Sequence, residues 1–316
     1  MSGPCSVCSA SEPPLDAYLE GMSTSKTRHL DHARAVARDE FYTTDDACTK
    51  EFSHYDFTGM RVICPCDDPE HSRIYRWFRD RYHELGLAGL VACGYRADGT
   101  GADGRYDLFG GSARHGIIGR YDGRTERIGD MDGSGDMFAP ETVALMDHAD
   151  IVVTNPPFSL FRALLTLTRL HTPHFLLLMP DVAMGYAQVT DMVRDGQARV
   201  GYSYSKRFYN PATGAVEHIA CAHWLTDLPV DRPAFVAHGD PGREFRTYDG
   251  TPVIDVPRAQ DIPADYMGLM GVPVSFLPFC DNTHWRLVSS PNLPGNIVPL
   301  LGGHPPFKRI FVQRVA

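Results

Sequence analysis

Short, continuously apolar segments alternate with helical patterns through much of this chain. Strands are predicted at 61–66, 89–93, 150–153 and 175–179, and helices at 72–85, 140–148 and 160–170. Strands that are apolar at every position are typical of a parallel sheet with both faces covered. The alternation therefore predicts an α/β fold with an open, mostly parallel sheet and helices on both faces. Such sheets bind ligands at the carboxyl ends of their strands.

The two ends of the chain differ from this pattern. Residues 1–38 are rich in Ser, Pro and small polar residues, and they predict a loose tail followed by a helix. Residues 39–228 hold the strand–helix alternation and end in a β-hairpin that turns at 210–214. Residues 229–316 are rich in proline and predict a β-rich region. A further hairpin is expected around 116–127, and short strands at 274–277, 286–288 and 308–313.

Composition excludes several classes of protein. The 316 residues, 43% of them hydrophobic, can bury a sizeable core. Eight cysteines are too few for a disulfide scaffold, and the N-terminus lacks the basic flank and apolar core of a secretory signal, so we expect a cytoplasmic protein. No apolar run reaches the roughly 18 residues of a spanning helix, so no membrane role is expected. The net charge of −9 argues against indiscriminate coating of nucleic acid, although a local basic surface can still bind one site.

One predicted strand runs directly into the sequence Asn155-Pro156-Pro157-Phe158. The two prolines fix the backbone and remove two N–H donors, so the loop offers acceptors, namely the Asn155 side-chain oxygen and the backbone carbonyls. Acceptors that hold both hydrogens of an amino group on an aromatic base would aim the nitrogen lone pair at an electrophile. Phe158 would stack on that base, which must be flipped out of a duplex. We predict that these four residues are catalytic; the alternative is a strand-ending turn capped by a core aromatic.

Several separate blocks resemble the EcoRI-type adenine-specific DNA methyltransferases. They are DEFYT (39–43), FTGMRVICPCDDPEHS (57–72), GDMFAPE (135–141), ADIVVTNPPFSLFR (149–162), YMGLMGVPVSFL (266–277) and FKRIF (307–311). NPPF alone is shared with methylases of rRNA and of protein glutamine, whereas the combination of blocks is more specific. The resemblance implies a Rossmann-like methyltransferase fold, S-adenosylmethionine as methyl donor and an adenine amino group in double-stranded DNA as acceptor. A cognate restriction endonuclease is compatible with the resemblance and is not required by it.

The resemblance also implies which residues bind the donor. The matching positions are Phe41, Tyr42 and Thr43 in the first block; Cys64, Pro65, Cys66, Asp67 and Asp68 after the first strand; and Asp136, Met137 and Phe138 in the adenosine-holding block. Carboxylates near a strand end can pair with the donor's ammonium, which makes Asp67 and Asp68 candidates for that contact. Their alternative role is N-capping of the helix that follows. The usual G-x-G turn and ribose-binding acid are replaced by Cys64-Pro65-Cys66 and Gly94-Tyr95, so the ribose contacts stay unassigned.

The hairpin carries the expected nucleic-acid contacts. Its segment KRFYNP (206–211) resembles the family's region near the flipped base. Phe208 or Tyr209 would stack on that base or wedge the duplex, unless these rings simply pack in the core. Arg199, Lys206 and Arg207 are candidate phosphate contacts, with a solvated charged face as the alternative. In this interpretation residues 39–228 form the catalytic domain and residues 229–316 the target-recognition region.

Other functions remain open at the level of the sequence. The same NPPF loop could serve an RNA or protein-amide methyltransferase. A metal-dependent phosphoesterase could be built on Asp67, Asp68, Glu70 and His71. A catalytically silent DNA-binding protein is a third alternative. No metal site is predicted. The cysteines at 5 and 8 lie in the expected loose tail with no second pair at a suitable spacing, and those at 64 and 66 are too close together and too buried for a zinc site.

Overall fold

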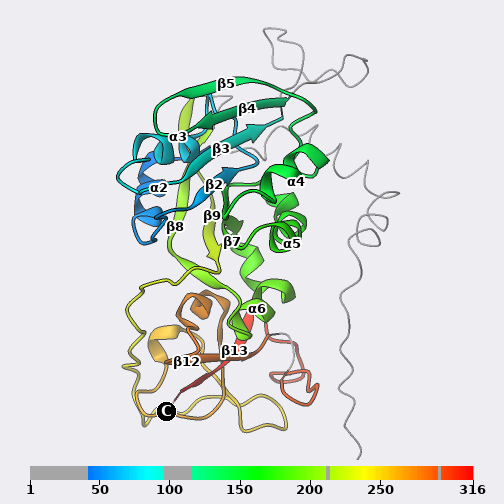
Figure 1. The fold of residues 1–316 in the computed structure, drawn as a ribbon. Coiled ribbons are helices and arrows are strands. Elements are labelled where there is room, and N and C mark those ends of the chain that lie inside the picture. The colour runs from blue at the N-terminus through cyan, green and yellow to red at the C-terminus, as the bar shows by residue number, and fades with distance from the viewer. Residues whose placement is uncertain (1–41, 96–115, 211–213, 291–292, 316) are drawn as a thin grey trace, which may run out of the picture. The chain divides into compact units, whose positions relative to one another are not determined.

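The computed structural model describes residues 42–95, 116–210, 214–290 and 293–315. The largest sheet in this part of the chain has nine strands in the order β1-β8-β9-β7-β6-β2-β3-β4-β5 (Figure 1). Its strands are β1 (Tyr42–Thr43), β2 (Arg61–Cys64), β3 (Gly89–Gly94), β4 (Gly116–Tyr121), β5 (Glu126–Met131), β6 (Ile151–Thr154), β7 (His174–Pro180), β8 (Arg199–Asn210) and β9 (Ala215–Thr226). The helices are α2 (Asp45–Phe52), α3 (Arg73–Asp80), α4 (Pro140–Met146), α5 (Phe161–His171) and α6 (Ala187–Arg194).

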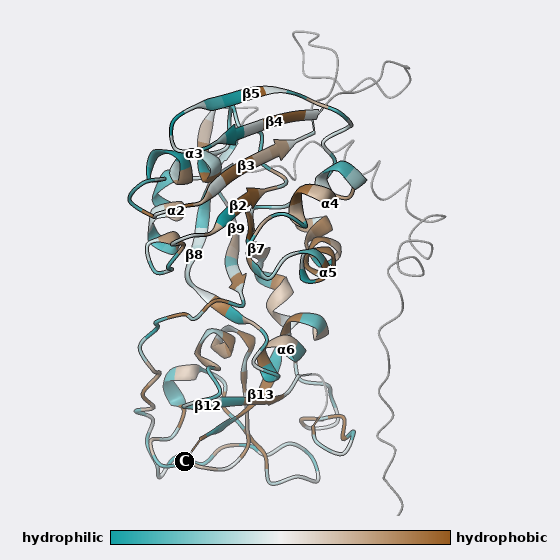
Figure 2. Cartoon of the chain, in the orientation of Figure 1, coloured by the Kyte–Doolittle hydropathy of each residue, from teal (hydrophilic) through white to brown (hydrophobic). Residues whose placement is uncertain are grey.

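Parallel pairing is concentrated at the centre of this sheet. β7, β6, β2 and β3 are parallel neighbours, and antiparallel hairpins extend the sheet on both sides, β4–β5 at one edge and β8–β9 next to β7. β6 is buried at every residue, as expected for a strand covered on both faces. The neighbouring parallel strands β2 and β3 are drawn mostly in the hydrophobic colour in Figure 2. The predicted α/β class is confirmed. The order also places the carboxyl ends of β2 and β6 side by side, where a ligand site is expected.

An aromatic core covers one face of the sheet near β2 and β9. Phe52 of α2 stacks on Phe78 of α3 and contacts Trp77 and Trp224 edge-on, with ring centroids 5.0–5.2 Å apart. Ser72 caps α3 by accepting a hydrogen bond from Tyr75 N. The helix predicted at 72–85 is therefore present but ends at Asp80, with turns beyond it.

Two helices between residues 39 and 228 were not predicted from the sequence. α2 follows β1 directly and begins after Thr44, whose side chain accepts from Ala47 N. α6 follows the short 3₁₀ helix η2 (Asp181–Gly185) and has no side-chain N-cap. The predicted N-terminal tail and helix lie outside the described residues.

A second sheet lies in the proline-rich region. Its strand order is β10 (Ile254–Asp255), β11 (Met270–Pro273), β13 (Arg309–Arg314) and β12 (Trp285–Ser289), which confirms the strands expected near 286–288 and 308–313. The strand predicted at 274–277 is wrong, because Val274–Phe279 forms the 3₁₀ helix η4. Pro273 sets the turn after β11, and Pro278 has no N–H to offer a sheet. Among the described residues, no helix has the length and apolar character needed to cross a bilayer.

Candidate active site

The loop after β2 is joined to the end of β6 through Asp67. This carboxylate is 4% exposed. It accepts a 2.6 Å hydrogen bond from Ser72 Oγ on one oxygen and a 2.6 Å hydrogen bond from Thr154 Oγ1 on the other. Thr154 is the last residue of β6 and directly precedes Asn155. The predicted cofactor loop and the predicted catalytic loop are thus fixed to each other at the carboxyl edge of the sheet.

Burial governs the ionisation of Asp67. It raises the pKa of this carboxyl from 3.8 to about 6, while the hydrogen bonds from Ser72 and Thr154 act in the opposite direction and Asp68 raises it slightly further. The ionised form still predominates near pH 7, and it can accept both hydroxyl hydrogens. A charge so well enclosed is suited to holding two loops in place.

Asp68 is more accessible than Asp67. Its side chain is 24% exposed, accepts from Glu70 N at 2.8 Å and lies 3.1 Å from His71 Nδ1. Neither aspartate caps α3, because Ser72 occupies that position, so the alternative N-capping role is wrong for both. Asp68, Glu70 and His71 form a cluster with the spacing of metal ligands, but Asp67 is not part of it, and Glu70 and His71 are exposed.

The block at 136–138 lies against the loop after β2. Cys66 Sγ is 3.4 Å from Met137 Sδ, and Asp136 Oδ1 accepts from Phe138 N at 2.9 Å. Immediately before this block, Gly135 packs against Gly116 at the start of β4, where a Cβ on Gly116 would lie 2.5 Å from the Gly135 backbone. Asp136, Met137 and Phe138 are all half-buried, whereas Cys64 and Pro65 are buried. The structure therefore brings two of the three predicted cofactor blocks together.

The catalytic loop continues straight from β6 into a helical turn. Asn155 is half-buried, Pro156 is buried and Pro157 is half-buried. The Pro157 carbonyl accepts from Leu160 N at 2.8 Å, which starts the 3₁₀ helix η1 (Phe158–Leu160) ahead of α5. Phe158 is half-buried against the aromatic core, and its ring meets Phe208 edge-on at a centroid distance of 6.4 Å.

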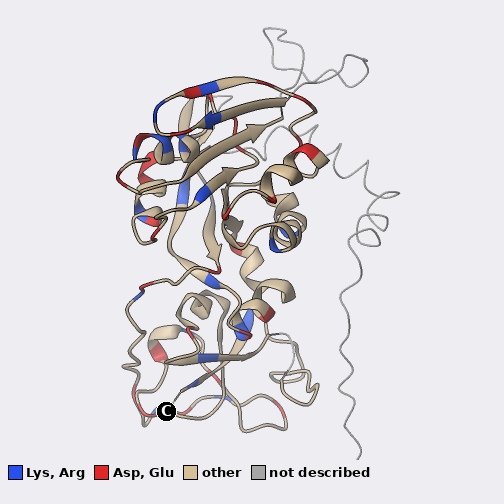
Figure 3. Cartoon of the chain, in the orientation of Figure 1, with Lys and Arg blue, Asp and Glu red and all other residues tan. Residues whose placement is uncertain are grey.

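The hairpin places the predicted nucleic-acid residues in different surroundings. Phe208 is fully buried beneath Phe158, so its ring has no face open to solvent. Lys206 and Arg207 are exposed and Tyr209 is half-buried. Figure 3 shows the basic colouring that Lys and Arg give to β8. Arg199 lies apart from Lys206 and Arg207. It pairs with Thr226 of β9, which in turn pairs with Leu176 of β7, so Arg199 lies in the body of the sheet.

β1 joins the first cofactor block to this hairpin. Tyr42 pairs with Tyr209 and Thr43 with Phe208 across an antiparallel ladder. Thr43 is buried, and its Oγ1 has no hydrogen-bond partner among the described residues. A polar atom of a bound donor would satisfy that hydroxyl, so this block fits a ligand-binding role. Phe41 lies outside the described residues.

Sequence analysis missed several residues that organise this region. Glu51 of α2 is fully buried and accepts from Tyr202 N at 2.8 Å and from Ser203 N at 2.6 Å, where the β8–β9 register shifts. Burial raises the pKa of Glu51, against the hydrogen bonds it accepts. Arg232 donates to the Gly201 and Tyr202 carbonyls on the same bulge. Glu51 and Arg232 contact residues far away in the chain, and such contacts leave no pattern in the local sequence. Ser72 and Thr154 were easier to find, because Ser72 begins a predicted helix and Thr154 follows a predicted strand.

The comparisons with known proteins agree with this arrangement. Residues 29–292 match the family described as "Adenine-specific methyltransferase EcoRI". The chain is 27% identical to the Type II methyltransferase M.MpnI of Mycoplasma pneumoniae over 82% of this chain and 85% of the relative. It is 29% identical to the Type II methyltransferase M.EcoRI of Escherichia coli over 81% and 87%, and 26% identical to M.MgeORF184P of Mycoplasma genitalium over 82% and 85%. This chain therefore belongs to the EcoRI family of adenine-specific methyltransferases.

Proposed function

We propose that this protein is a site-specific DNA adenine N6-methyltransferase that uses S-adenosylmethionine as its methyl donor. One observation carries the proposal beyond family membership: Thr154 and Asp67 hold the NPPF loop against the loop after β2. An acceptor loop and a donor-binding loop must lie together for direct transfer between two bound substrates. The donor supplies a methyl group on a positively charged sulfonium, which leaves as a neutral thioether.

In this proposal the chain orients the acceptor amino group. The Asn155 side-chain oxygen accepts one amino hydrogen and the Pro156 carbonyl accepts the other. We assign the second contact to Pro156 because the Pro157 carbonyl already accepts from Leu160 N. Phe158 stacks on the flipped base, and Phe208 supports the Phe158 ring from beneath. The half-buried position of Asn155 suits a group that must be both fixed and reachable.

The donor would lie against the blocks that meet at the carboxyl edge. Asp68 is the better candidate for the donor's ammonium, because Asp67 already accepts two hydroxyl hydrogens and is almost fully enclosed. We propose that Asp67 positions the loop instead. Tyr42 and Thr43 on β1, and Asp136, Met137 and Phe138, are further candidates for donor contacts. In the loop after β2, the half-buried Cys66 is more accessible to a donor than the buried Cys64 and Pro65.

We propose Lys206 and Arg207 as phosphate contacts and Tyr209 as an aromatic neighbour of the target base. Their exposure on β8, close to Phe208 and hence to the catalytic loop, favours them over Arg199. Residues 229–316 would form the target-recognition region and 39–228 the catalytic domain, working in the cytoplasm on double-stranded DNA. The proposed activity does not require a cognate restriction endonuclease; such a partner would cleave the same sites when they are unmethylated.

The experiment is methyl transfer from labelled S-adenosylmethionine to unmodified DNA, to RNA and to protein in parallel. We expect label in DNA, as N6-methyladenine in one sequence context that single-molecule sequencing reads. Label in RNA or in a protein amide, with none in DNA, would replace this proposal with the corresponding methyltransferase. Activity that depends on a divalent cation without binding of S-adenosylmethionine would favour the phosphoesterase alternative.

A further inference from the structure

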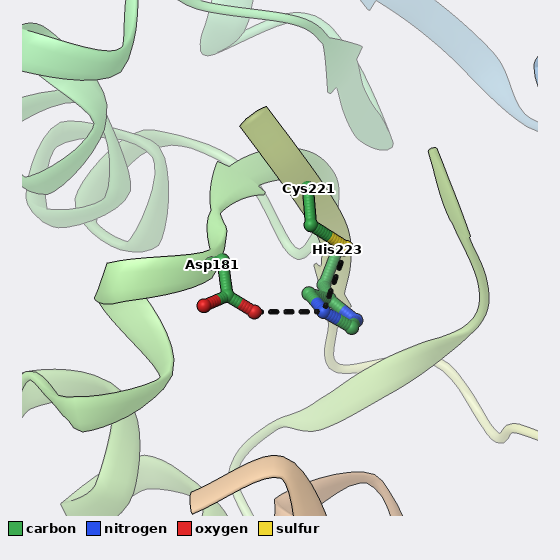
Figure 4. Close-up of side chains that lie close together, drawn as sticks. All are labelled: Asp181, Cys221 and His223. Carbon is green, nitrogen blue, oxygen red and sulfur yellow. Dashed lines mark hydrogen bonds and ion pairs between the residues drawn. The ribbon is translucent and has the colours of Figure 1, made fainter. Parts of the chain in front are cut away.

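Three side chains of different chemistry meet beside the carboxyl end of β7. Asp181 follows β7 and opens η2, whereas Cys221 and His223 lie on the neighbouring strand β9. Cys221 and His223 are two residues apart on β9, and their side chains meet although the β8–β9 register shifts between His218 and Ala222. Figure 4 shows the Asp181 carboxylate and the Cys221 thiol both directed at the His223 ring. The mechanism proposed above uses none of the three.

The distances within this cluster match the geometry of a metal site. His223 Nε2 is 3.4 Å from Asp181 Oδ1 and 3.6 Å from Cys221 Sγ. The first distance is long for a hydrogen bond, which is normally about 2.7–3.2 Å between nitrogen and oxygen. In a tetrahedral zinc site, with bonds of about 2.3 Å to sulfur and about 2.0–2.2 Å to nitrogen and oxygen, the N···O edge is about 3.4 Å and the N···S edge about 3.6 Å. All three ligand atoms lie within 4.8 Å of one another.

The surroundings allow a cation to enter and to be held. The His223 side chain is 13% exposed and that of Asp181 is 41% exposed, so the cluster is enclosed on the strand side and open on the η2 side. The pairing of Met179 with His223 fixes the histidine on the sheet next to the residues that lead into Asp181.

We propose that Asp181, Cys221 and His223 form a Zn²⁺-binding site with a fourth position open to water. The thiol releases its proton to solvent when the ion binds, and the thiolate, imidazole and carboxylate then supply three ligands. Thiolate and imidazole select zinc over the hard cations Mg²⁺ and Ca²⁺. The ion would tie η2 to β9. The cluster of Asp68, Glu70 and His71 has no sulfur ligand and is more exposed, so we do not extend the proposal to it.

The test is titration of the full-length, chelator-treated protein with Co²⁺, followed by displacement with Zn²⁺. We expect one ion per chain, visible bands of tetrahedral Co²⁺ and a near-ultraviolet thiolate band, all removed by Zn²⁺. Cys221→Ser should abolish the thiolate band. Cys221→Ser and His223→Gln should each weaken Zn²⁺ binding by at least about tenfold, the lower end of the loss seen when even an outer partner of a ligand is removed. His71→Gln, in the other cluster, is the matched control and should bind as the wild type does.

The midpoint of thermal unfolding gives a second readout. Bound Zn²⁺ should raise it in the wild type and in His71→Gln, but much less in the two ligand variants, because a ligand stabilises the state that binds it. Circular dichroism establishes that each variant is folded, and His223→Gln decides the question if Cys221→Ser does not fold. The proposal is overturned if the wild type gives no thiolate band. It is also overturned if the band persists in Cys221→Ser, which would place the ion on other cysteines such as those at 5 and 8.

Discussion

Thr154 Oγ1 donates a 2.6 Å hydrogen bond to Asp67 Oδ2, so the last residue of β6 and the loop after β2 hold each other at the carboxyl edge of the sheet. The two residues are 87 positions apart in the chain. One belongs to the strand that presents Asn155, and the other lies beside the accessible carboxylate of Asp68. Under the proposed function, this bond would couple the placement of the acceptor base to the placement of the methyl donor.

Removing this hydroxyl should impair both stability and donor binding. In Thr154→Val the side chain keeps its shape, but the buried Asp67 loses one of its two hydroxyl donors. We expect the free energy of unfolding to fall by about 1–3 kcal/mol and KM for S-adenosylmethionine to rise. Chemical denaturation and steady-state kinetics measure the two effects. Thr154→Ser, which keeps the hydroxyl, is the control; a valine variant indistinguishable from wild type would remove this bond from the account.

The main features of the fold could be predicted because they are local. The strand before Asn155 contains the continuous apolar run Ile151–Val153, and the residues on either side of the turn at 210–214 alternate between polar and apolar, so periodicity alone predicts both elements. α6 was missed because it has no side-chain N-cap and includes β-branched residues. The strand expected at 274–277 became η4 because prolines on both sides of the apolar residues favour a turn over a ladder.

The site was predictable only in part. NPPF stands out as a motif, and the family blocks pointed to the loop after β2 and to 136–138, which the structure brings into contact through Cys66 and Met137. Phe208 resembled a base-stacking residue in the sequence, yet β1 and Phe158 cover it. Glu51 gave no signal, because its hydrogen bonds to β8 arise only from tertiary packing.

Asp67 should make stability depend on pH. Its pKa is raised from 3.8 to about 6 on folding, so the folded state holds this proton more tightly than the unfolded state. Stability from this group is fully present below about pH 4 and is lost as the pH rises through about 6. A rise of this size corresponds to up to about 3 kcal/mol.

Asp67→Asn isolates this effect, because other groups titrate equally in both proteins. We expect the free energy of unfolding of the wild type, minus that of Asp67→Asn, to decrease between pH 4 and pH 7 in urea titrations. If this difference in unfolding free energy stays constant or increases with pH, the pKa of Asp67 is not raised in the folded protein.

Phe158 and Phe208 should separate activity from stability. Phe208 is fully buried, so Phe208→Ala should cost about 3–5 kcal/mol of unfolding free energy. Phe158 is half-buried, so Phe158→Ala should destabilise the protein less and reduce kcat/KM for DNA more, through lost base stacking worth about 1–3 kcal/mol. Thermal unfolding and methylation rates distinguish the two variants. The separate roles would be contradicted if the loss of kcat/KM, divided by the loss of unfolding free energy, were the same in Phe158→Ala and Phe208→Ala.

Lys206 and Arg207 should govern the salt dependence of DNA binding. Each substitution to Ala should weaken binding to all DNA sequences and reduce the slope of log affinity against log salt by about 1. Fluorescence anisotropy with a labelled duplex at several salt concentrations measures that slope. Arg199→Ala is the matched control and should leave it unchanged, because Arg199 lies in the body of the sheet. A slope that changes only in Arg199→Ala would reverse the assignment.

The most direct measurement compares wild type with Asn155→Ala for N6-methyladenine formed in duplex DNA, with S-adenosylmethionine binding measured on the same samples by calorimetry. We predict that the wild type methylates adenine and that Asn155→Ala binds the donor with similar affinity but methylates at least about 100-fold more slowly, as expected when a group that orients the reacting nitrogen is lost. Methylation by Asn155→Ala at the wild-type rate would contradict the account.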